Sequence, residues 1–138
     1  MPYLHLYAQA YLTTSFMRYF LLFLSVLFVV FGLVQLNDPD PWLWLLLYLY
    51  VAAIFVLAFR QQFYRWLGLG GLVVVVGWAL TLVPAIVDWI QMGMPTITGS
   101  MKAEAPHIEL AREFFGLVLC GIALGWYTWR AFRPSSTS

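Results

Sequence analysis

The chain has 138 residues, of which 63% are hydrophobic and only 9% are charged, and its formal net charge is +1. Soluble globular domains are about one quarter charged, so this composition, with a mean hydropathy of +0.84, indicates a lipid bilayer as the solvent. The seven basic residues are scattered and form no stripe that could follow phosphates, which excludes nucleic-acid binding. Cys120 is the single cysteine, which excludes an intrachain disulfide, a CxxC redox pair and a thiolate metal cage.

The first segment, residues 1–15, carries Tyr3, Tyr7 and Tyr11 at helical spacing. Tyrosines favour the headgroup level of a bilayer, so one interpretation of this segment is a short interfacial helix. The alternative is that Met17 is the natural start and that the preceding residues are a tolerated extension. A secretory signal is not expected, because no basic region precedes a short apolar core and a cleavage site.

Four uncharged windows follow in chain order. A helix that crosses a bilayer needs roughly 20 apolar residues, within a range of about 17–25. Because these runs are continuous and not alternating, they predict helices and not barrel strands. We therefore expect an all-α membrane protein, a four-transmembrane-helix bundle over residues 16–133 with a disordered tail at 134–138. The windows are Tyr19–Asn37, Pro41–Phe59, Trp66–Val87 and Phe114–Trp129, and the helices predicted around them span about 16–36, 41–60, 66–88 and 109–131.

Charge is distributed unevenly between the two ends of these helices. Five of the seven basic residues lie on one side and all six acids on the other. Since basic residues favour the cytoplasm, both termini are predicted to be cytoplasmic, in agreement with an even number of crossings. This predicts a multi-pass membrane protein, in the inner membrane if the source is bacterial. The five basic residues are Arg18, Arg60, Arg65, Arg130 and Arg133, and the acids are Asp38, Asp40, Asp88, Glu104, Glu109 and Glu113.

The last two helices contain residues that shape helix packing. Pro84 is predicted to kink the third helix just upstream, with Thr81 and Trp78 as partners for the freed backbone groups. Gly121 and Gly125 form a GxxxG pattern, a spacing that lets membrane helices approach closely. We expect this pattern to mediate close packing, with a membrane-protein partner or with a second copy of the chain.

Polar residues gather at the predicted outer ends of the helices. The fourth window has sixteen residues and rises only about 24 Å, less than the hydrocarbon thickness of about 30 Å. Arg112 and Glu113 are therefore expected at the outer membrane boundary, where polar residues are costly and often functional. The residues predicted to form a ligand-binding site there are Gln35, Asn37, Asp38, Asp40, Trp44, Tyr48, Asp88, Glu109, Arg112 and Glu113.

Two interpretations of this outer site remain open. In the structural interpretation, Asp40 caps the second helix and Pro41 is its first residue. Glu109 and Glu113 then complement the dipole of the last helix, and Arg112 forms a salt bridge across the site. In the functional interpretation, up to five carboxylates against one arginine bind a divalent cation or a cationic ligand, or take part in a proton-coupled step.

Metal ligation by hard oxygen ligands is a weaker hypothesis. Such a site would use Asp38, Asp40 and Glu113 together with backbone carbonyls, yet the chain has no EF-hand spacing. It also has no Ser-His-Asp, HExxH, P-loop or GxGxxG pattern, so the sequence does not indicate an enzyme.

Soft metal ligands form a second, still weaker hypothesis. Met92, Met94 and Met101 precede His107 in the long outer loop and would suit Cu(I), although methionines in an interfacial loop are more often hydrophobic anchors. Haem is disfavoured because His5 and His107 are the only histidines and lie on opposite sides of the predicted bilayer. The sequence therefore assigns no cofactor.

Two blocks of the chain resemble the transmembrane protein 220 family, a group of small four-helix membrane proteins. The block 35–41, followed by Trp44 and Tyr48, is similar to the QxNDPD-type motif after the first helix of that family. The block 109–117 is similar to its E-x-x-R-E-x-x-G-L segment at the start of the last helix. The resemblance covers roughly residues 17–130 and implies the fold and an association of the two motifs, but no particular activity.

Three classes of function follow from these observations. The leading hypothesis is an ion- or small-ligand-binding membrane module with its acidic site at the outer end. The alternative is a small accessory or assembly subunit of a larger membrane complex, in which the same residues are structural. A membrane enzyme or transporter ranks last, because transporters usually show internal repeats or broken helices and this chain shows only one proline kink.

Overall fold

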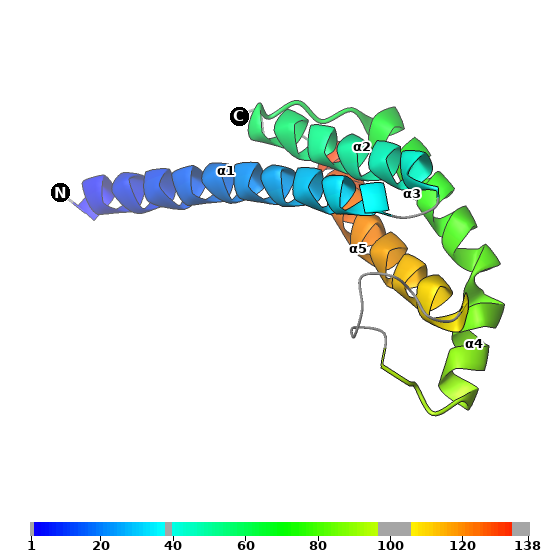
Figure 1. Ribbon diagram of the computed structural model, residues 1–138. Coiled ribbons are helices and arrows are strands. Elements are labelled where there is room, and N and C mark those ends of the chain that lie inside the picture. The colour runs from blue at the N-terminus through cyan, green and yellow to red at the C-terminus, as the bar shows by residue number, and fades with distance from the viewer. Residues whose placement is uncertain (1, 38–39, 97–105, 134–138) are drawn as a thin grey trace.

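The computed structural model describes residues 2–37, 40–96 and 106–133, and all regular structure in these ranges is helical (Figure 1). The prediction of an all-helical chain is confirmed for these residues. Asp38, Met101, Glu104 and the predicted tail at 134–138 lie outside them. In chain order the elements are α1 (Pro2–Val34), the 3-10 turn η1 (Gln35–Asn37), α2 (Pro41–Phe59), α3 (Arg65–Thr81), α4 (Val83–Gln91) and α5 (Pro106–Phe132).

The helices pack as two antiparallel units. Helix α1 packs along α2, and both α3 and α4 pack on α5, while α2 and α5 contact each other across the two units (Figure 1). The core lies along this junction, where Val51 of α2 and Leu117 and Leu124 of α5 are fully buried. Large apolar side chains elsewhere on α1, α2 and α3 are exposed, as expected of helices that face lipid.

Length and hydropathy identify candidate membrane spans among the described helices. Residues Thr14–Asn37 and Pro41–Phe59 each form a helix long and apolar enough to cross a bilayer. Helices α3 and α4 add a third candidate if they are counted as one bent span. Helix α5 is not among these candidates and carries Glu109, Arg112 and Glu113 in its first turns, so the predicted fourth crossing stays a prediction.

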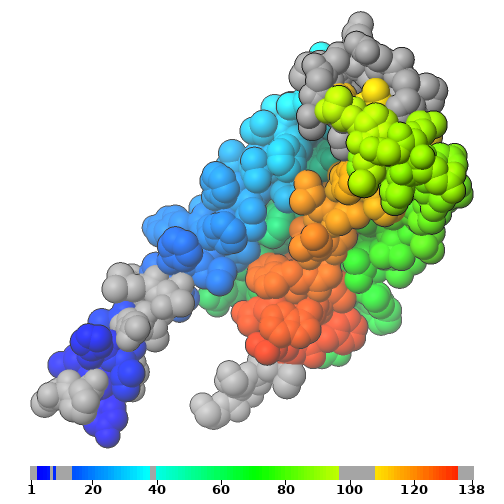
Figure 2. All heavy atoms as spheres, turned by 90° about the horizontal axis from the view of Figure 1, so that it is seen from below, coloured from blue at the N-terminus to red at the C-terminus, as the bar shows by residue number. Residues whose placement is uncertain are grey.

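Helix α1 is longer than the predicted first helix. It is continuous over 33 residues from Pro2, so the predicted boundary after residue 15 coincides with no break in the helix. The physical reason is that residues 3–31 contain no proline or glycine that would end it. Figure 2 shows that the amino-terminal part of α1 extends away from the other helices. Tyr3, Leu4 and Leu6 are exposed on this extension.

The predicted kink at Pro84 is confirmed. Helices α3 and α4 are bent by 44° at Leu82, and Pro84 lies in the first turn of α4. Proline has no N–H to donate to the carbonyl four residues earlier, so the helix cannot continue regularly. Thr81 Oγ1 donates to the carbonyl of Trp78 at 2.6 Å, so the two residues predicted to take part at this break form a hydrogen bond with each other.

Close helix approach occurs at other glycines than the GxxxG pair. A Cβ added at Gly125 would meet nothing within 4 Å, and one at Gly121 would meet only Val75 Cγ1, at 3.6 Å. A Cβ added at Gly68 would instead lie 2.5 Å from Thr128 Oγ1, between α3 and α5. The GxxxG pair therefore makes no tight contact with described residues of its own chain, and a contact with a partner stays a prediction.

Candidate functional site

The acidic end of α2 begins with Asp40 at the N-cap position and Pro41 in the first turn. Pro41 starts the helix as predicted, since its fixed φ suits the first helical position. The predicted capping by the Asp40 side chain is wrong, because that side chain forms no capping hydrogen bond. Its backbone has φ −121° and ψ 69°, away from the usual extended geometry of a capping residue. The Asp40 side chain is exposed instead.

Trp44 and Tyr48, one and two turns into α2, are buried in the core and do not line an open surface. The Trp44 ring lies 4.6 Å from the Trp78 ring of α3, centroid to centroid. The Tyr48 ring lies 6.0 Å from both Phe28 and Phe31 of α1. These two site residues therefore connect α2 to both α1 and α3.

Helix α5 contributes the charged residues of the second motif. Glu109 is exposed, whereas Arg112 and Glu113 are half-buried and both interact with other residues. Ala111, which precedes Arg112, is fully buried, and this shows which face of α5 turns inward. Gly116 follows on this helix at the point where it crosses α2. A Cβ added there would lie 2.5 Å from Tyr48 Oη and 3.8 Å from Trp44 Cζ3.

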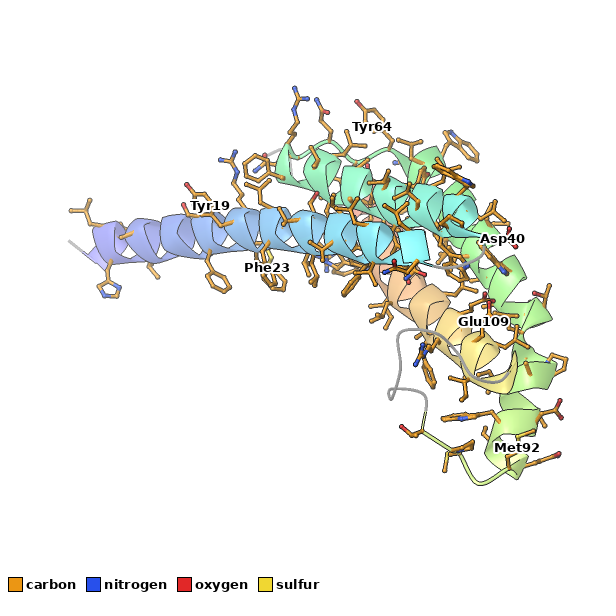
Figure 3. All side chains as sticks on the ribbon, viewed as in Figure 1. Tyr19, Phe23, Asp40, Tyr64, Met92 and Glu109 are labelled. Atoms are coloured by element: carbon orange, nitrogen blue, oxygen red, sulfur yellow. The ribbon has the colours of Figure 1, made fainter. Side chains whose placement is uncertain are left out.

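The contact of Tyr48 with Gly116 gives a reference point from which the distances of the charged residues along α2 and α5 can be measured. At about 1.5 Å per residue, Trp44 lies about 6 Å outward from Tyr48, and Arg112 lies the same distance outward from Gly116. Asp40 and Glu109 lie farther out, by about 12 Å and 10 Å. Figure 3 shows that these outer ends of α2 and α5 diverge, with Asp40 and Glu109 on separate helix ends. The structure thus brings Arg112 and Glu113 to the level of Trp44, but it does not bring Asp40 against Glu109.

The other predicted site residues lie at the edges of this arrangement. Gln35 is half-buried and Asn37 is exposed, both in η1, which contacts α2. Asp88 is exposed on α4, which packs on α5. Trp89 holds α4 in place, because its ring makes an edge contact with Phe115 at 5.8 Å.

The predicted metal sites lie partly outside the described part of the chain. No group of three His, Cys, Asp or Glu residues within the described part could hold a metal ion. Asp38 and Met101 lie outside the described residues, and His107 is placed only by its backbone in the first turn of α5. Met92 lies at the far end of α4, away from Asp40 (Figure 3), and Met94 is exposed with a φ of 55°.

Sequence reasoning missed the aromatic residues that support the site from neighbouring helices. Trp78 and Phe28 contact Trp44 and Tyr48 directly, yet neither was predicted as part of the site. The only available signal is that aromatic residues recur in the outer halves of the first three apolar windows. This signal does not show which of the aromatic residues contact one another in the folded chain.

Comparison with known proteins agrees with the resemblance carried by the two sequence blocks. A family model described as "Transmembrane family 220, helix" matches residues 27–129, which is most of the chain. The match includes both the block at 35–41 and the block at 109–117. Neither a search of curated proteins nor a search of solved structures gave a match.

Proposed function

The chain belongs to transmembrane family 220, and on this premise we propose a four-helix, multi-pass membrane protein that binds a cationic ligand at its non-cytoplasmic end. In this proposal α1, α2, the bent α3–α4 pair and α5 each cross the bilayer. Helix α5 has 27 residues and a length of about 40 Å, which is sufficient for a crossing.

The distribution of charge supports the proposed orientation. Arg18 of α1 lies over the Phe59 ring at the end of α2, and Arg65 of α3 lies over the Phe132 ring at the end of α5. These basic residues thus lie at the carboxyl ends of α2 and α5, where Arg60 and Arg130 also stand. By the positive-inside rule this end is cytoplasmic. Reporters fused after Ser138 test this orientation. A reporter that works only in the cytoplasm should give a signal. A signal from a reporter that works only outside the cytoplasm would show that the orientation is reversed.

The proposal of a cationic ligand rests on the exposure and the hydrogen bonding of the Asp40 side chain. Its carboxylate is exposed and is not used to cap α2, so capping does not explain why an acid stands there. Glu109 is also exposed, and Glu113, about one turn farther along α5, lies nearer to the contact of Tyr48 with Gly116 than either of them. Because the described residues hold no three-ligand metal cluster, the proposed ligand is a cation bound by one or two carboxylates with water, or an organic cation.

Thermal unfolding in an uncharged detergent tests this proposal. The probes are Na⁺, Ca²⁺, Mg²⁺ and spermidine, compared at equal ionic strength. A bound cation at a concentration of 100 times its Kd would add about 2.7 kcal/mol of stability. We expect Asp40→Asn to remove the stabilisation and Asp88→Asn, the same charge change on α4, to retain it. No stabilisation by any probe, or equal loss in both variants, would refute the proposal.

A second candidate function, an accessory subunit of a larger membrane complex, is favoured by one feature of α1. Residues 2–17 contain no charged residue, and they extend beyond the contact of Arg18 with Phe59. An isolated helix of this length is marginal in water, so a partner would stabilise it. Native mass spectrometry from mild detergent should then show one defined larger partner, lost on deletion of residues 2–15. A monomer in both samples would contradict this role.

A further inference from the structure

The end of the bundle opposite Asp40 is strongly basic, and we call it the basic end. It consists of five exposed arginines, of which three lie in helices, one in the connection between α2 and α3, and one directly after α5. Every acidic residue that the structure describes lies toward the other ends of the helices. The basic end contains Arg18, Arg60, Arg65, Arg130 and Arg133, and the described acids are Asp40, Asp88, Glu109 and Glu113.

The connection between α2 and α3 is fixed to α5 by one buried side chain. The Tyr127 hydroxyl donates to the carbonyl of Gln62 and accepts from the N–H of Tyr64, both at 2.9 Å. Tyr127 is fully buried, so this pair of hydrogen bonds is shielded from water. As a result Arg60 and Arg65, at the two ends of the connection, are held beside the last turns of α5.

Aromatic rings restrain four of the five guanidinium groups. The Cζ atom of Arg133 lies 3.9 Å from the centroid of the Trp129 ring, and that of Arg18 lies 4.8 Å from Phe59. Arg65 and Arg130 lie over Phe132 and Phe63 at 5.2 and 5.4 Å. A guanidinium packed on a ring keeps N–H donors at its edge, and these match the oxygens of a phosphate in a two-point contact.

We propose that the basic end binds the headgroup phosphate of an anionic phospholipid. Three observations support a lipid as the source of that phosphate. The arginines stand where the apolar windows end, which is the level of lipid headgroups. Exposed apolar side chains such as Val56 and Leu67 lie next to them and would contact the acyl chains. No described acid lies at this end to repel the phosphate. The proposal does not depend on the cation site at the opposite end.

Native mass spectrometry of the full chain tests the proposal, with equimolar phosphatidylglycerol and phosphatidylcholine added in detergent. We expect bound phosphatidylglycerol to exceed phosphatidylcholine. Arg60→Gln and Arg133→Gln should each weaken its binding about fivefold, the effect of one arginine near an anionic membrane surface. Arg60→Lys keeps the charge but loses the two-point contact, so it should bind more than Arg60→Gln and less than the unchanged chain. Gln91→Glu makes the same charge change at the exposed end of α4 and should have no effect.

Three results would overturn this proposal. Both lipids carry a headgroup phosphate, but in phosphatidylcholine the choline cation balances its charge. Equal retention of both lipids would therefore show that the net negative charge of the headgroup is not recognised. An equal loss in Gln91→Glu and the arginine variants would assign the preference to net charge alone. Full displacement of phosphatidylglycerol by millimolar inorganic phosphate would assign the site to the free ion. Arg65 is left unchanged because its Nε donates to the Ala131 carbonyl at 3.4 Å, so its replacement would alter packing.

Discussion

Gly116→Ala tests the central contact between α2 and α5. The added Cβ would lie 2.5 Å from Tyr48 Oη, a separation that real Cβ contacts essentially never show. The hydroxyl is the far end of a side chain, but this side chain cannot easily move. Tyr48 is only 6% exposed and packs among Phe28, Phe31 and Trp44. We therefore expect the two helices to be forced apart or the ring to leave its preferred rotamer.

Two opposing contributions determine how much Gly116→Ala changes the free energy of unfolding. Replacing glycine by alanine inside a helix stabilises it by about 1 kcal/mol. Inserting a methyl group into a well-packed core costs about 1–3 kcal/mol. Gly125→Ala provides the control, because its Cβ would meet nothing within 4 Å and only the helix term applies. The free energy of unfolding should therefore be about 1–3 kcal/mol lower for Gly116→Ala than for Gly125→Ala.

Thermal unfolding in detergent measures this difference, at about 3–5 °C per kcal/mol for a chain of this size. A double-mutant cycle with Tyr48→Phe identifies the cause, because removing the hydroxyl leaves Cζ as the nearest ring atom, at an ordinary 3.7 Å. Gly116→Ala should cost less in the Tyr48→Phe background. Equal stability of Gly116→Ala and Gly125→Ala, or no coupling in the cycle, would refute the contact.

Two further substitutions test other parts of the structure. Tyr127→Phe removes both hydrogen bonds to the connection after α2 and should lower the free energy of unfolding by about 1–3 kcal/mol. An unchanged melting temperature would show that the connection is held by other contacts. Arg112→Ala removes a half-buried guanidinium that interacts with other residues, which should cost about 1–2 kcal/mol. Full retention of stability in thermal unfolding would show that Arg112 does not support the acidic end.

Much of the fold could be predicted because membrane helices leave a strong one-dimensional signal. Continuous apolar windows identified α2, most of α3 and about half of α1, and Pro84 identified the bend. The extension of α1 could not be placed, since Gln9 and Thr13 lower the hydropathy of the segment without ending the helix. A bilayer boundary and a helix boundary are separate events, and only the second needs a proline, a glycine or a cap.

The rotation of the helices about their axes was much harder to predict. A soluble helix has one apolar face that shows which side packs inward, but a helix in lipid is apolar on all sides. The GxxxG spacing does not show which face packs within the chain, where Gly68 and Gly116 make close approaches, and its packing against a partner stays a prediction. The placement of Trp44 and Tyr48 in the core depends on the same rotation.

The crossing at Tyr48 and Gly116 determines what the charged residues can do together. Helices in contact at one point and inclined to each other separate steadily on either side of it, so separation grows with distance from the contact. Arg112, about one turn outward, stays within reach of α2, whereas Asp40 and Glu109, about two turns outward, lie beyond that range. A cation held between the two helices would therefore sit near Glu113, above the buried ring of Trp44. A cation bound by Asp40 would instead lie against α2 and η1. Loss of cation binding in Asp40→Asn would therefore indicate the position at Asp40, and retention would indicate the position near Glu113.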